Sequence, residues 1–174
     1  MYDAMLQYHP DGAMERLTWQ YPPHAGLLFS PIGLLPYPIA YVMWFAIGVA
    51  GLIGSLLVAK VDQRAIMTLL LTSPVFLAFA TGQIALIVTS LMLIAVFWAT
   101  TRPILAGLAA GLLTIKPQLG IFLPLVFIAG GHWRALASAV VFSLSFWVGS
   151  VALLGVDIWV AFLERIGLIS DLVA

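Results

Sequence analysis

The residue in the most distinctive setting is Lys116, which lies with Pro117 and Gln118 between two apolar stretches, residues 104–115 and 119–129. An ionisable side chain amid apolar residues indicates a functional site by default. A cation there could hold the phosphate of a lipid-linked substrate, and Gln118 is a second candidate contact. The alternative is a lysine whose ammonium reaches the lipid headgroups along its own aliphatic stem.

Tyr21, His24 and Gln83 are further binding candidates. Two prolines between Tyr21 and His24 fix an extended entry. This segment could therefore form one wall of an outward-facing pocket, with His24 donating to a phosphate or a sugar. Gln83 follows Gly82, and its amide offers two donors and an acceptor for sugar hydroxyls. The alternatives are an aromatic anchor with a rigid turn over residues 19–24 and a solvated tight turn at Gly82.

The acidic residues near the start of the chain are Asp3, Asp11 and Glu15. They could supply a general base for a sugar hydroxyl, or they could be solvated charges of a tail. The three histidines are scattered and cysteine is absent, so we expect no metal site. The sequence has no glycine-rich phosphate loop and no serine nucleophile elbow, and we expect no cofactor.

The elements that carry these residues must be membrane helices, because 63% of the 174 residues are hydrophobic and only 8% are charged. Soluble domains have about 25% charged residues, and a chain of this size lacks the interior to bury so much apolar surface. The composition excludes a soluble globular enzyme and a disordered chain. A formal net charge of zero without a basic cluster excludes a nucleic-acid binder. We expect membrane lipids as partners.

The charge-free runs predict an all-α, polytopic integral membrane protein, since about 20 apolar residues cross a bilayer core. Residues 104–115 and 119–129 are too short to cross alone. They predict a hairpin of half-length helices with Lys116 at its tip, or alternatively one broken span with Lys116 near the midplane. Full spans are expected over residues 37–59 and 135–155, and two slightly shorter spans of 16 residues each over 65–80 and 84–99.

Two shorter segments complete the outline. Residues 27–35 are apolar and contain Pro31, which predicts a re-entrant or outer-leaflet half-helix. Residues 157–171 predict an amphipathic helix in the interface plane. The chain then divides into an outer-side segment over 1–24, a transmembrane region over 25–156 and an interfacial helix over 157–174.

The basic residues of the short loops set the expected orientation. If residues 104–129 form a hairpin, four of these residues fall on one side, which is then cytoplasmic. The N-terminal segment, Gln83 and Lys116 fall on the outer side. The four basic residues are Lys60, Arg64, Arg102 and Arg134.

The order of several short motifs resembles glycosyltransferase family 87. The resemblance covers residues 2–159. Its first motifs are Trp19-x-Tyr21-Pro22-Pro23, Pro31, Leu34-Leu35-Pro36 and Trp44. The later motifs are Gly82-Gln83, Arg102-Pro103, Ala106-Gly107-Leu108, Lys116-Pro117 and Trp133-Arg134.

The resemblance implies a GT-C-like helical bundle and a hexosyltransferase similar to polyprenol-phosphate-mannose-dependent α-mannosyltransferases. Such an enzyme would act at the periplasmic or extracellular face of the plasma (inner) membrane. A hydroxyl of a lipid or glycan acceptor would attack the anomeric carbon of a sugar carried by polyprenyl phosphate, and the lipid phosphate would leave. Lys116 matches the family's Lys-Pro position and would stabilise that phosphate. Gln83 matches the Gly-Gln position, and Tyr21 with His24 lies beside the matching Tyr-Pro-Pro.

The chain departs from the family pattern at its start. The family's catalytic aspartate lies in an outer loop after a first transmembrane helix, ahead of the Tyr-Pro-Pro motif. Tyr2-Asp3-Ala4 resembles a Tyr-Asp pair found downstream of that aspartate. The catalytic base is therefore unassigned, with Asp3 as a substitute candidate, and we expect an internal portion of a larger enzyme or a degenerate copy. A non-catalytic membrane scaffold subunit and a lipid or solute carrier are the alternative functions.

Overall fold

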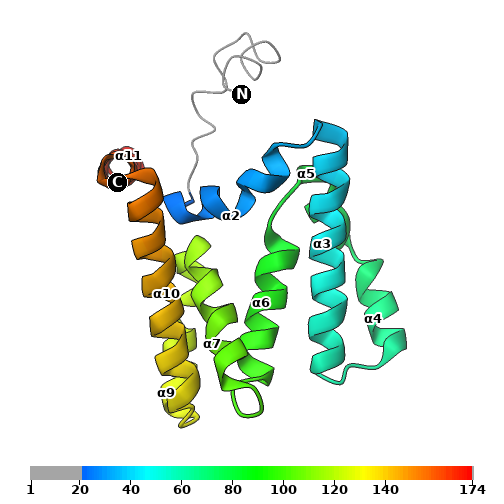
Figure 1. Ribbon diagram of the computed structural model, residues 1–174. Helices are drawn as coiled ribbons and strands as arrows, with labels where there is room; N and C mark the ends of the chain where they lie inside the picture. Colours follow the sequence, from blue (N-terminus) through cyan, green and yellow to red (C-terminus); the bar gives the residue numbers. More distant parts are fainter. Residues whose placement is uncertain (1–20, 174) are drawn as a thin grey trace.

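The computed structural model describes residues 21–173, and within that range every regular element is a helix (Figure 1). Helix α2 (Pro23–Gly33) crosses one end of a row of upright helices, and we call this end of the bundle the α2 end. The upright helices pack in the order α10 (Trp133–Leu154), α7 (Pro103–Leu112), α6 (Ala85–Phe97) and α3 (Tyr37–Val58).

Helices α3 and α10 have 22 residues each and are apolar enough to cross a membrane. They confirm the spans predicted over residues 37–59 and 135–155, and with them the all-α membrane protein. The connections after α3, after α6 and before α10 all lie at the end of the bundle opposite α2 (Figure 1). We call this end the basic end, because it carries Lys60, Arg64, Arg102 and Arg134.

The span predicted over residues 65–80 is two helices, α4 (Gln63–Leu70) and α5 (Ser73–Thr81), which are bent by 49°. Pro74 lies in the first turn of α5, where its missing N–H costs no helical hydrogen bond. The Thr72 hydroxyl donates to the carbonyl of Leu69 at 2.6 Å and covers one of the last carbonyls of α4. Taken together, the pair is long and apolar enough to count as one broken span.

The segment around Lys116 is a hairpin. The rising arm is α7 with the 3-10 helix η2 (Leu113–Ile115), and the returning arm is α8 (Pro117–Gly120) with α9 (Leu123–Ala129). The arms meet at the tip, since a Cβ atom on Gly120 would lie 3.2 Å from Leu113 Cβ. The hairpin interpretation is therefore confirmed against the alternative of one broken span, and the depth of Lys116 in the membrane stays a prediction.

Small residues let the upright helices approach closely, as is common where membrane helices pack. A Cβ atom on Gly107 of α7 would lie 2.4 Å from Ser138 Cβ and 2.6 Å from the backbone nitrogen of Ala139 in α10. Gly111, one turn later, faces Phe142 in the same way. The contact between α7 and α10 is the tightest in the described part of the chain, and it holds the rising arm of the hairpin upright.

Helix α2 begins at Pro23, four residues before the predicted start, because proline is well suited to a first helical position. It continues through Pro31, which cannot donate to the carbonyl of Leu27. The hydroxyl of Ser30 donates to that carbonyl at 3.1 Å instead. Helix α11 (Val156–Val173) follows α10 and contacts α2. The placement of α11 in the membrane interface stays a prediction.

Candidate functional site

Lys116 occupies the tip of the hairpin at the α2 end. It separates η2 from α8, with φ −136° and ψ 72°, and Pro117 begins the returning arm. Its backbone N–H donates to the carbonyl of Leu113 at 2.9 Å, which closes the turn. The side chain is half-buried. Among the described residues, no side chain or carbonyl pairs with its ammonium group. This cation is therefore available to an anionic ligand.

His24 lies beside this turn. It is 6% exposed, and its Nε2 lies 3.1 Å from the hydroxyl oxygen of Thr114. Its ring stacks on the indole of Trp159 in α11. Burial lowers the pKa of His24, and a hydrogen bond to the backbone of Thr114 opposes that shift. Burial therefore favours the neutral form of the imidazole over the charged form.

The other residues predicted at the site are less closely joined to it. Tyr21 packs against the main hydrophobic core, and burial raises the pKa of its phenol. Gln118 is exposed on α8, two residues after Lys116. Asp3 lies outside the described residues, as do Asp11 and Glu15.

Gln83 lies in the connection between α5 and α6, which is also at the α2 end (Figure 1). Gly82 before it adopts φ 63° and ψ 25°, a left-handed conformation that ends α5. The indole of Trp44 donates to the carbonyl of Gly82 at 3.2 Å and ties this turn to α3. The Gln83 side chain is exposed. No hydrogen bond within residues 21–173 joins it to Lys116.

An apolar groove of about 360 Å³ begins at the hairpin tip. Thr114 and Pro117, on either side of Lys116, both line it. The groove continues between α9 and α10, and several of its walls are surface side chains, so it opens on the side of the bundle. Residues that form these walls include Leu113, Ile121, Val140 and Leu144. Lys116 thus lies between two residues that line one end of an apolar groove.

Thr114, Trp159 and the groove are the parts of the site that the sequence analysis missed. Thr114 could have been noticed as the polar residue two positions before Lys116. Trp159 carries no local signal, because its contact with His24 depends on how α11 folds back on α2. Among the described residues, no group of three His, Asp or Glu side chains could hold a metal ion.

The fold and the site define the class of this protein: a multi-spanning, all-α membrane protein in which Lys116, unpaired within residues 21–173, lies beside an apolar groove. The sequence model of glycosyltransferase family 87 matches residues 19–173. The chain therefore belongs to glycosyltransferase family 87, which confirms the resemblance found in the sequence motifs.

A curated relative comes from Mycolicibacterium smegmatis and is named polyprenol-phosphate-mannose-dependent alpha-(1-2)-phosphatidylinositol pentamannoside mannosyltransferase. It is 31% identical over an alignment of 141 residues, and the match covers 72% of this chain and 33% of the relative. The chain thus aligns with about a third of the length of that protein. No solved structure matches the chain.

Proposed function

We propose that this chain belongs to a membrane enzyme that transfers a hexosyl group, with mannose as the first candidate, from a polyprenyl-phosphate donor to a hydroxyl of a lipid or glycan. Lys116 would hold the donor phosphate, and its positive charge would stabilise the phosphate as it leaves. The prenyl chain would lie in the groove between α9 and α10. No nucleotide sugar and no covalent sugar–enzyme intermediate is needed.

The observation that carries this proposal is the half-buried Lys116, whose ammonium group has no partner among the described residues and which lies next to an apolar groove. A sugar on polyprenyl phosphate has the matching chemistry, with a phosphodiester that carries one negative charge at the end of a long hydrocarbon chain, and a second negative charge develops on the phosphate as it leaves. The dependence of the mycobacterial relative on polyprenol-phosphate-mannose supports the same class of donor.

The proposed site faces the outer side of the plasma membrane. Four basic residues gather at the basic end, and such residues favour the cytoplasmic side of a membrane. The hairpin tip lies at the opposite end, with α2 across it (Figure 1). Gln83, Gln118 and Tyr21 are proposed to contact the sugar or the acceptor from this end. Asp3 is proposed as the group that accepts the hydroxyl proton.

The test is sugar transfer from radiolabelled polyprenyl-phosphate mannose in membranes that contain the protein. Lys116→Met is expected to lower turnover by about 100-fold or more, since it removes the charge that stabilises the leaving phosphate in a water-poor site. Arg102→Met is the matched control, because Arg102 also precedes a helix-opening proline but is exposed at the basic end. It should change turnover by no more than about twofold, as exposed charges usually contribute little.

Turnover that persists in Lys116→Met while the protein stays folded would contradict the assignment of the phosphate site. Binding of polyprenyl phosphate to the purified protein supplies a second readout. The same substitution should abolish it, and Arg102→Met should leave it unchanged.

A further inference from the structure

Helix α11 reaches the α2 end of the bundle through Trp159. Its indole lies on the imidazole of His24, with ring centroids 5.8 Å apart and ring planes 17° from parallel. The indole is itself held by α10, because its Nε1 donates to the Ser150 hydroxyl at 3.0 Å. That hydroxyl in turn donates to the carbonyl of Trp147 at 2.8 Å. His24 therefore packs against a ring whose own position is fixed.

The contact between His24 and Thr114 has a defined direction. The Thr114 hydroxyl has a single hydrogen, which it donates to the carbonyl of Gly111 at 2.6 Å. At its 3.1 Å contact with His24 Nε2, the same oxygen must therefore accept. The neutral tautomer that fits this contact carries its hydrogen on Nε2, which leaves Nδ1 as a buried acceptor with no hydrogen-bond partner within residues 21–173.

This hydrogen bond acts on the turn that holds Lys116. Thr114 belongs to η2 and stands two residues before Lys116. The Lys116 N–H closes the same turn by donating to Leu113. A chain of contacts therefore runs from Trp159 through His24 and Thr114 to the backbone of Lys116.

We infer that His24 and Trp159 are positioning residues for the turn that carries Lys116, and that α11 is thereby part of the donor site. This inference depends on the proposed function in one respect, which is that the ligand of the turn is a donor phosphate. The contacts from α11 through α2 to η2 stand on geometry alone. The Nε2 hydrogen of His24 is used inside the protein, so this atom positions Thr114 instead of contacting a donor phosphate.

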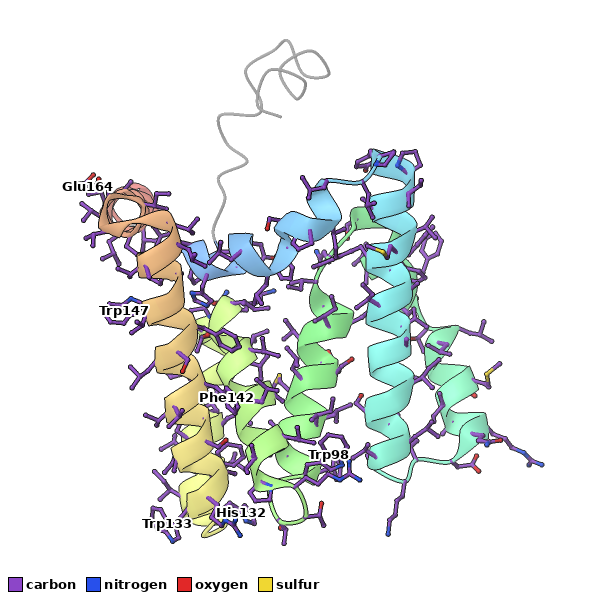
Figure 2. All side chains as sticks on the ribbon, viewed as in Figure 1. Trp98, His132, Trp133, Phe142, Trp147 and Glu164 are labelled. Atoms are coloured by element: carbon purple, nitrogen blue, oxygen red, sulfur yellow. The ribbon has the colours of Figure 1, made fainter. Side chains whose placement is uncertain are left out.

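The first test measures amide hydrogen exchange over residues 113–118 in the protein reconstituted in phosphatidylethanolamine and phosphatidylglycerol nanodiscs. Trp159→Ala is expected to speed exchange of this turn about tenfold or more, because local protection falls when the contacts that order a segment are lost. Trp159→Phe keeps an aromatic ring on His24 and should stay close to the wild type. Trp133→Ala, at the basic end of α10 (Figure 2), is the matched control and should change nothing. Unchanged exchange of the turn in Trp159→Ala would overturn the inference.

The second test separates the two ring nitrogens of His24 and does not depend on removing Trp159. Glutamine places an amide N–H near the position of Nε2, whereas asparagine places its amide near the position of Nδ1. His24→Gln should keep the protection of the turn, and His24→Asn should lose it. The opposite order would overturn the inference, because it would show that Nδ1 and not Nε2 carries the function.

The third test measures how the loss of Trp159 changes the kinetics of the enzyme with its sugar donor. Trp159→Ala is expected to lower kcat/KM for polyprenyl-phosphate mannose about tenfold, because a misplaced cation weakens both the binding of the donor phosphate and its stabilisation as it leaves. An unchanged kcat/KM in Trp159→Ala would overturn the inference. Absence of turnover in the wild-type protein would count against the proposed function instead, and the exchange experiments would still decide the positioning role.

Discussion

Arg102 and Lys116 have the same local backbone structure but lie in different surroundings. Each is a basic residue followed by a proline, and each caps the start of a helix, with φ −138° and ψ 64° at Arg102 and φ −136° and ψ 72° at Lys116. Arg102 is exposed at the basic end, and its guanidinium lies 4.9 Å from the ring centroid of Trp98. Lys116 is half-buried at the α2 end and has no partner among the described residues.

The difference shows which features arise from local sequence and which from packing. The proline after each basic residue disfavours a helical backbone at that residue, and the two backbones are nearly the same. The surroundings specify the role of the charge. Trp98 stabilises Arg102, whereas the groove and the neutral His24 leave Lys116 without compensation. An uncompensated cation is a cost to stability that a binding site retains for its ligand.

The largest expected effect concerns the sides of the membrane on which the two cations lie. The chain has no cysteine, so a single thiol introduced by substitution reports on its own position. In intact cells, a membrane-impermeant maleimide should label Gln118→Cys and leave Thr101→Cys unlabelled until the membrane is opened. Labelling of both thiols from the same side would show that the two cations do not lie on opposite sides of the membrane, and it would contradict the proposed outer site.

A second effect concerns α7, the helix that separates the two cations. Gly107→Ala places a Cβ atom against Ser138 and the backbone of Ala139, and such overpacking costs about 1–3 kcal/mol. Gly149→Ala in α10 is the control, since nothing lies within 4 Å of its added Cβ atom. It should stabilise the protein by up to about 1 kcal/mol. Reversible unfolding in mixed micelles measures both changes. Equal stability of the two variants would show that close packing does not hold α7 in place.

The smallest expected effect is the change in protein stability when each of the two cations is replaced. Arg102→Met removes an exposed cation–π contact and should destabilise the protein by about 0.5–1 kcal/mol. Lys116→Met removes an unpaired, half-buried charge and should leave the unfolding temperature unchanged or raised. Thermal unfolding of both variants in one detergent tests this difference in sign. Destabilisation by Lys116→Met would indicate that its charge has a structural partner.

The long spans could be predicted from the sequence because a charge-free run of more than 20 residues leaves few alternatives in a membrane. The bend between α4 and α5 was missed, although Ser73-Pro74 carried the signal of a helix start after Thr72. The apolar character of residues 65–80 suggested continuity, and the missing proline N–H decided against it.

Only part of the site could be predicted from the sequence. Lys116 stood out because a charge amid apolar residues is visible in a linear sequence. The contacts of His24 were not, since Thr114 is 90 residues away and Trp159 further still. Their proximity results from how α2 and α11 cover the hairpin, which no local pattern encodes.

The short rising arm of the hairpin has one more consequence, for the lipid around the protein. Residues Pro103–Ile115 rise about 20 Å, whereas the hydrocarbon core of a bilayer is about 30 Å thick. In the proposed orientation, with Arg102 at the inner headgroups, Lys116 would lie about 10 Å beneath the outer headgroups. The outer monolayer would then dip at this point, since local thinning costs little per ångström of mismatch. A glycolipid carrier would sink its charged head into this depression to meet Lys116, without being lifted out of the membrane.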